Sequence, residues 1–201
     1  MKQVLLAILA TIVAACFCIH AEYIMRAGPS SDPPQSLVDF EPPPPFIADA
    51  STNGSAKEST VILFYHPHCP CTKATVNNFK TISENIEARV HLLALAYRPK
   101  DSNETWIETE ITKQLRELGF EIATDTDGTF CRQFDVYTSG HILVYESNER
   151  LVFNGGITTS RGHEGSNYAL ADFLKSIDGS RDANSVWPVF GCPIIPVESS
   201  T

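Results

Sequence analysis

The sequence lacks the features by which chains bind nucleic acids or organic cofactors. Of its 201 residues only 15 are Lys or Arg, against 24 Asp or Glu, so the formal net charge is −9. No basic run or basic face is visible, which argues against a nucleic-acid partner. No glycine-rich phosphate-binding loop occurs, so no organic cofactor is implied. We attribute the acidic surplus to solubility.

Charge is also missing from the N-terminal segment. The apolar run VLLAILATIVAACFCI begins soon after Lys2, and no further charge occurs before Glu22. Residues 1–27 are therefore predicted to be a signal anchor or a signal peptide. An uncleaved anchor is our first interpretation, a lipidated Cys16 the second, and simple cleavage the third. All three predict a domain on the periplasmic or extracytoplasmic side, and the first predicts a single-pass protein of the cell membrane.

Composition divides the remaining chain into three parts. Residues 28–59 are rich in Pro, Ser and Gly, and such chain is extended and semi-stiff, so it is predicted to be a linker. Residues 60–180 are predicted to form one domain, because 43% hydrophobic composition supplies an ordinary core. Residues 181–201 are a tail, and WPVFGCPIIPV within it is too proline-rich for a helix.

Hydrophobic patterns predict the elements of the domain. Buried strands are expected over 60–66 and 90–97, and a hairpin where HILVYE and RLVFNGG flank SNE. Helices are expected over 71–86, 106–118 and 163–177. The stretch ATDTDGTFCRQFDV is expected to be a polar loop with a short helical turn. A helix between two strands implies parallel pairing, and the hairpin adds an antiparallel pair, so the predicted sheet is mixed.

Two thiols stand one residue apart where the first strand ends. In FYHPHCPCTKATV, Cys69 and Cys71 come directly before the helix-like segment. Pro70 suits the first position of a helix, which makes Cys69 the predicted N-cap. A thiolate there faces free backbone N–H groups at the positive end of the helix dipole, so its pKa should fall. A protonated His66 or His68 would lower it further.

Three cysteines are candidate partners for Cys69. A bridge to Cys71 requires Cys69 to leave helical geometry, as an N-cap does, and its small ring would be strained and readily reduced. Cys192 lies in VFGCPI, a tail segment able to fold back over the site, and the tail is predicted to pack there. We favour Cys192 over Cys131, which we interpret as a structural thiol.

The predicted order of elements is that of the thioredoxin fold, with cysteines where that fold carries its reactive site. Together HPHCPCT, TSG, GGIT, SRGHEG and VFGCPI resemble the RedB-like branch of bacterial membrane-anchored thioredoxin-fold proteins. The resemblance implies an α/β, thioredoxin-like fold, a central mixed β-sheet flanked by helices, with an N-terminal membrane anchor. Two positions depart from the thioredoxin pattern. Thr72 stands where thioredoxins have their second cysteine, and Gly140 stands at about the place of their cis-proline.

We therefore predict an exported, membrane-tethered thiol–disulfide oxidoreductase that acts on protein thiols and disulfides through a Cys-Pro-Cys site. The predicted catalytic residues are Cys69, Cys71 and Cys192. The residues expected to shape the site are His66, His68, Pro70, Thr138, Ser139, Gly140, Arg161 and His163. The last two lie in SRGHEG, at the predicted N-terminus of the last helix. The free backbone N–H groups of a helix N-terminus favour binding of an anion or a partner carboxylate.

Two alternatives use the same scaffold. Thiolate with imidazole suits copper(I) or zinc, so His68, Cys69 and Cys71 are candidate ligands of a copper(I)-binding module. The other alternative is a binding module whose cysteine site is vestigial.

Overall fold

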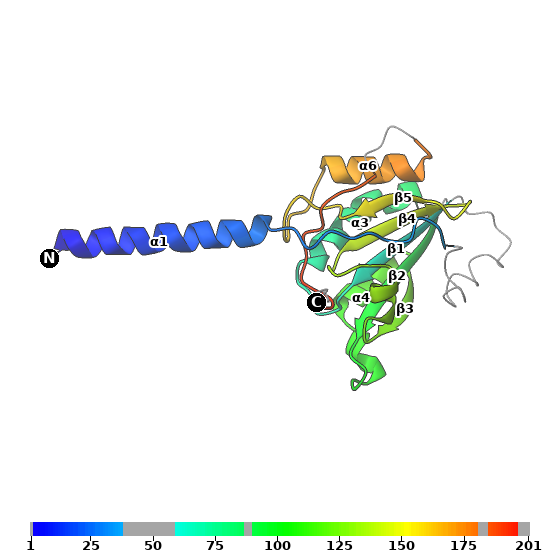
Figure 1. Ribbon diagram of the computed structural model, residues 1–201, viewed down its shortest axis with the longest axis horizontal. Coiled ribbons are helices and arrows are strands. Elements are labelled where there is room, and N and C mark those ends of the chain that lie inside the picture. The colour runs from blue at the N-terminus through cyan, green and yellow to red at the C-terminus, as the bar shows by residue number, and fades with distance from the viewer. Residues whose placement is uncertain (1, 38–58, 87–89, 181–184, 197–201) are drawn as a thin grey trace.

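A five-stranded mixed sheet forms the centre of the domain (Figure 1). The computed structural model describes residues 2–37, 59–86, 90–180 and 185–196. The strands, in the spatial order β3-β2-β1-β4-β5, are β1 (Ser59–Tyr65), β2 (Val90–Arg98), β3 (Glu121–Thr126), β4 (His141–Glu146) and β5 (Leu151–Gly155). β1, β2 and β3 run parallel, whereas β4 is antiparallel to β1 and β5 to β4. The predicted thioredoxin-like fold is confirmed.

The two faces of the sheet are covered differently. One face packs against three helices, namely α3 (Thr72–Ile86), α4 (Glu110–Glu117) and α6 (Tyr168–Ile177). The other face packs against the short α5 (Thr129–Gln133), the segment around Leu37, and Ile194 and Ile195 of the tail. Burial of an isoleucine side chain stabilises a fold by roughly 2 kcal/mol, so the tail is part of the core.

The N-terminal segment forms one long helix, α1 (Lys2–Met25). It projects away from the sheet as a blue rod in Figure 1, and none of its residues is buried. The helix is long and apolar enough to cross a membrane.

The predicted linker over 28–59 needs correction in its first part. The amide of Leu37 donates to the carbonyl of Glu149 (3.1 Å), and that of Leu151 donates to Gln35 (2.8 Å). The hydroxyl of Tyr145 also donates to the Pro34 carbonyl (2.9 Å). Residues 28–37 therefore lie along the domain and do not act as a spacer. Residues 38–58 lie outside the described residues.

β3 is a strand that the sequence pattern did not reveal. We expected polar loop from residue 123 onward, but this segment pairs with β2 at the edge of the sheet. An edge strand is half exposed and needs no apolar alternation. Asp125, its one buried residue, accepts hydrogen bonds from the amides of Phe130 and Cys131 in the first turn of α5.

Two helices are shorter than predicted. The expected helix over 106–118 is divided into a 3-10 helix, η2 (Glu104–Ile107), and α4, whose N-cap is Thr109. α6 begins at Tyr168, because the side chain of Asn167 accepts from the Leu170 amide (2.9 Å) and caps it there. The SRGHEG segment is therefore a loop that precedes the helix and does not form its N-terminus.

The buried His141 predicts a loss of stability in acid. Burial lowers its pKa to about 4, whereas the ring titrates near 6.5 in an unfolded chain. The unfolded state therefore binds the proton first, and the stability that is complete above pH 6.5 is lost as the pH falls towards 4. We expect this residue to lower the free energy of unfolding by about 2 kcal/mol between pH 7 and pH 4.5.

Urea denaturation of the full chain and of His141→Gln measures this contribution as the difference between their two pH profiles. Profiles of the same steepness would contradict the assignment.

Candidate functional site

Three cysteines that are distant in sequence lie together at one end of the sheet. The sulfur atoms of Cys69, Cys71 and Cys192 all lie within 4.8 Å of one another. Cys69 is buried, and the other two are half-buried. The first two come from the turn between β1 and α3, and the third comes from the tail. The structure thus brings together the three cysteines that the sequence predicted as catalytic.

The first two cysteines occupy a tight turn ahead of α3. The amide of Thr72 donates to the Cys69 carbonyl (3.2 Å), and that of Lys73 donates to the Pro70 carbonyl (3.3 Å). These are i→i+3 bonds, and the regular helix begins only at Thr72. Pro70 therefore lies in this turn rather than at the first position of the α-helix.

The tail is fixed beside the turn by main-chain pairing. The amide of Ser139 donates to the Cys192 carbonyl (2.9 Å), and the amide of Ile194 donates to Tyr137 (2.8 Å). A Cβ atom on Gly191 would stand 1.9 Å from the Ser139 carbonyl oxygen, so only glycine permits this approach. The backbone of the predicted TSG segment thereby holds the third thiol in place.

Hydrogen bonds make Cys69 the most acidic of the three thiols. Burial opposes its ionisation, but donors from Cys192 and Thr72, both side chain and backbone, outweigh burial and lower its pKa. Burial and the Cys69 thiolate raise the pKa of Cys71. Burial and the interactions with Cys69 raise the pKa of Cys192 to about 12. Cys69, hydrogen-bonded by its neighbours, is therefore the thiol of the cluster that ionises most readily.

A directed chain of hydrogen bonds leads to the Cys69 sulfur. The amide of His66 can only donate, and it donates to Oγ of Ser139 (2.8 Å). The Thr72 hydroxyl donates to the Cys69 sulfur, since its hydrogen bond lowers the pKa of that thiol. Its single hydrogen is then in use, so in the 2.7 Å contact between the two hydroxyls Ser139 donates to Oγ1 of Thr72.

Thr72 belongs to the candidate site, although the sequence analysis did not include it among the site residues. It stood out only as the residue that replaces the second thioredoxin cysteine. Its position three residues after Cys69, at the start of the helix, was the available signal.

The ring of His66 does not supply the positive charge that its protonation would have given. The ring of His66 stacks on Tyr97 (5.5 Å between centroids) and meets Trp106 edge-on (5.2 Å). Burial lowers its pKa, and His68 lowers it further, so the ring is neutral near pH 7. Nε2 of His68 lies 3.1 Å from the Trp106 carbonyl and donates to it. The thiolate is thus favoured chiefly by neutral donors.

Arg161 joins the cluster, whereas His163 does not. The Arg161 guanidinium donates to the Gly191 carbonyl through Nη1, and its charge helps Cys71 to ionise. Its Nε donates to the Tyr23 carbonyl of α1 (3.1 Å). His163 is exposed, and its backbone amide donates to the Ser160 carbonyl (3.3 Å).

The backbone conformation of Gly140 accounts for the absence of a cis-proline at the position where thioredoxins have one. Its φ is +93°, a conformation that proline cannot adopt, and its amide donates to the Phe64 carbonyl (2.9 Å). The chain therefore enters β4 through a turn of a different kind. Thr138 and Ser139, which precede it, are buried beside the tail.

Cys131 lies apart from the cluster. It is buried against the other face of the sheet, together with Phe134 and Leu143. Burial and the nearby carboxylate of Asp125 raise the pKa of its thiol far above the usual range. The geometry agrees with its interpretation as a structural thiol.

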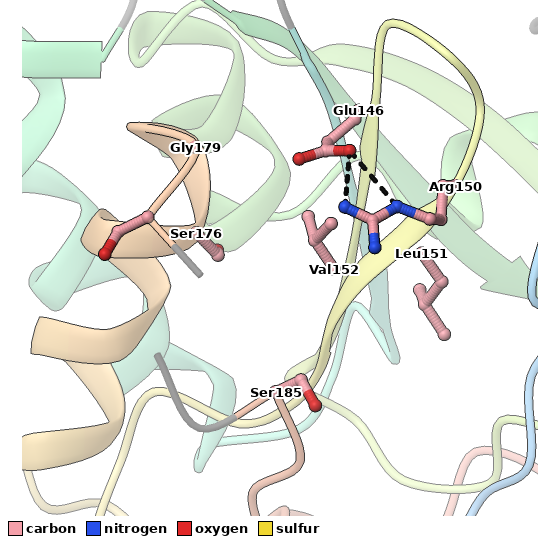
Figure 2. A pocket seen from close by; sticks show the side chains of 8 residues that line it. Glu146, Arg150, Leu151, Val152, Ser176, Gly179 and Ser185 are labelled. Atoms are coloured by element: carbon pink, nitrogen blue, oxygen red, sulfur yellow. Dashed lines mark hydrogen bonds and ion pairs between the residues drawn. The ribbon is translucent and has the colours of Figure 1, made fainter. Parts of the chain in front are cut away.

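A polar pocket lies at the other end of β4 (Figure 2). Glu146 and Arg150 form an ion pair at one side of it (2.9 Å), and Ser176 of α6 and Ser185 line it too. None of the predicted site residues contributes to its lining. The pocket is therefore separate from the cysteine cluster.

The comparisons with solved structures support the fold. The chain is similar to a hypothetical protein from Sinorhizobium meliloti 1021, at 15% identity and a TM-score of 0.53, over 69% of this chain and 80% of that one. It is also similar to an uncharacterized conserved protein from Geobacillus kaustophilus, at 18% identity and a TM-score of 0.54, over 88% and 95% of the two chains.

A secreted disulfide oxidoreductase from Mycobacterium tuberculosis matches with a TM-score of 0.44 and 14% identity, over 61% of this chain and 82% of that one. No protein-family model and no curated protein matches the chain. Likeness at these identities shows the fold alone, so the RedB-like assignment stays a prediction.

The hydrogen-bond chain predicts that Thr72→Val slows the reaction of Cys69 with alkylating reagents. The substitution keeps the shape of the buried side chain but removes the O–H donor, so the thiolate loses one charge-assisted hydrogen bond. We expect alkylation of Cys69 at pH 7 to slow roughly ten-fold, with its pH profile displaced to higher pH.

Thr72→Ser retains the hydroxyl and is the matched control. Mass spectrometry of the Cys69 peptide at several pH values measures both rates, and an unchanged profile in Thr72→Val would show that the donor is unimportant.

Proposed function

We propose that the protein is a membrane-tethered thiol–disulfide oxidoreductase in which Cys69 is the nucleophile and Cys192 is the resolving cysteine. The observation that carries this proposal is the cluster of three sulfurs around one thiol of lowered pKa. Thiol–disulfide exchange needs a thiolate and a second thiol within reach of it, and the cluster supplies both.

The choice of Cys192 over Cys71 follows from the contacts of the two thiols. Cys192 is hydrogen-bonded to Cys69 through both its side chain and its backbone, and its thiol also interacts with that of Cys71. The Cys69 thiolate acts on Cys71 through charge repulsion and raises the pKa of the Cys71 thiol. The tail thiol therefore interacts with both other thiols and lies within reach of the Cys69 sulfur that it would attack.

The exchange proceeds in two balanced steps. The Cys69 thiolate attacks one sulfur of a substrate disulfide, so a Cys69–substrate bond forms, the substrate bond breaks, and the other substrate sulfur leaves as a thiolate. Cys192 then attacks the Cys69 sulfur, a Cys69–Cys192 bond forms, and the second substrate thiolate leaves. The substrate has gained two electrons and the protein has lost them. The reverse sequence oxidises a substrate dithiol.

The electrostatics of the cluster favour this order of events. In the resting state the negative Cys69 sulfur is one cause of the raised pKa of Cys192. Once Cys69 is bonded to substrate its charge is gone, so Cys192 ionises more easily and becomes a nucleophile. Resolution is thereby delayed until a mixed disulfide exists.

The position of α1 supports protein substrates at a membrane surface. The last turn of α1 is bonded to the loop that lines the cluster, since the Arg161 amide donates to the Ile24 carbonyl (3.1 Å). The amide of Gly28 also donates to Val189 in the tail (2.8 Å). If α1 spans the membrane with the domain on the extracytoplasmic side, the cysteines lie near the bilayer and meet thiols presented there.

A trapping experiment tests the pair. The reduced full chain in detergent is treated with glutathione disulfide, and the adducts are mapped by mass spectrometry. Cys192→Ser removes the resolving thiol, so glutathionylated Cys69 should accumulate to roughly ten-fold the wild-type level. The wild type should instead hold a Cys69–Cys192 disulfide.

Two further variants complete the test. Cys69→Ser should form neither product, and Cys71→Ser should still form the Cys69–Cys192 bridge. A Cys69–Cys71 bridge in the wild type would transfer the resolving role to Cys71. The absence of any adduct or bridge would leave a scaffold with a vestigial site.

A further inference from the structure

The proposed exchange leaves one thiol of the cluster without a role. Cys71 is half-buried, and its sulfur lies within 4.8 Å of both sulfurs that take part in the exchange. Three converging thiols are more than a disulfide needs. We therefore considered which ligand would engage all three at once.

We propose that Cys69, Cys71 and Cys192 together form a trigonal thiolate site for copper(I). A cation bound to three sulfurs at about 2.3 Å in one plane holds those sulfurs about 4 Å apart. Every sulfur pair in the cluster lies within 4.8 Å. The site therefore needs only a small contraction, which rotation of the side chains can supply.

The donor set selects the metal. Thiolate ligands favour soft cations such as copper(I) and zinc and disfavour magnesium, calcium and manganese. Structural zinc sites take four ligands, and among the described residues no fourth Cys, His, Asp or Glu completes the group. Three-coordination by sulfur suits copper(I).

The donor set differs from the one that the sequence suggested. His68 was a candidate ligand beside Cys69 and Cys71, but Nε2 of His68 is directed to the Trp106 carbonyl. The tail cysteine takes the third place. Folding of the tail onto the domain thus completes the proposed site, which two residues of the turn alone do not form.

The surroundings compensate for the charge of such a site. Three thiolates and one copper(I) carry a net charge of −2. The guanidinium of Arg161 lies beside Cys71, and N–H and O–H donors from Thr72 are directed at Cys69. Donors of this kind to ligand sulfurs are the outer-shell interactions that hold metal ligands in place. Binding releases the remaining thiol protons to solvent.

Copper(I) binding can be tested separately from the exchange reaction. Copper(I) and the Cys69–Cys192 disulfide use the same sulfurs, so each excludes the other. Reduced protein should bind the metal, and protein oxidised to the disulfide should not.

Anaerobic titration of the reduced full chain in detergent, with copper(I) bicinchoninate as the probe, tests the site. All variants carry Cys16→Ala and Cys18→Ala, which remove the exposed thiols of α1. We expect one copper per chain. We expect each of Cys69→Ser, Cys71→Ser and Cys192→Ser to weaken binding roughly 100-fold or more, since even outer-shell changes cost 10–100-fold.

His68→Ala is the matched control and should bind copper as the parent does. X-ray absorption should show three sulfur atoms at about 2.3 Å from the metal. A linear two-sulfur site, a Cys192→Ser variant with parental affinity, loss of binding in His68→Ala, or tighter binding of zinc would each overturn the proposal. If the reduced protein binds no copper but forms the Cys69–Cys192 bridge in the glutathione experiment, the copper site alone is refuted. Copper binding without the bridge would refute the exchange alone.

Discussion

The site depends on the close approach of two backbone segments, at Ser139 and at Gly191 and Cys192. The hydrogen bond from the Ser139 amide to the Cys192 carbonyl is possible because Gly191 has no side chain to meet the Ser139 carbonyl. Burial of Ile194 and Ile195 in the core holds the tail against the sheet beyond it. Without this pairing Cys69 would lose the donors from Cys192, and the cluster would contain two thiols instead of three.

Activation of Cys69 comes from donors and not chiefly from positive charge. A buried thiolate is costly, and the cost is offset here by hydrogen bonds from the tail and from the first residue of α3. The histidines beside it are engaged with Tyr97 and Trp106. With neutral donors, the pKa values of Cys71 and Cys192 depend on the charge of Cys69, and they fall when that charge is lost. A fixed positive charge would hold all three thiols closer to ionisation.

Arg161 contacts three parts of the chain that are far apart in the sequence. It contacts the last turn of α1, the tail at Gly191, and the surroundings of Cys71. Arg161 therefore contacts both the end of the N-terminal helix and the cysteine cluster. This contact, together with the packing of residues 28–37 along the domain, leaves little free chain between α1 and the site. The cysteine cluster is therefore held close to the end of the helix.

The sequence by itself determined the sheet-forming strands with buried apolar runs, the apolar N-terminal helix, and the position of Cys69 between a strand and a helix. These follow from local periodicity and composition, which act over a few residues. It did not reveal β3, because an edge strand such as EIATDT carries no apolar alternation. Nor did it reveal that Thr72 donates to Cys69 or that the histidines turn towards Trp106. Only the tertiary structure decided which thiols meet, because Cys192 reaches Cys69 through pairing with Thr138 and Ser139, and contacts between residues so distant in the chain leave no local pattern.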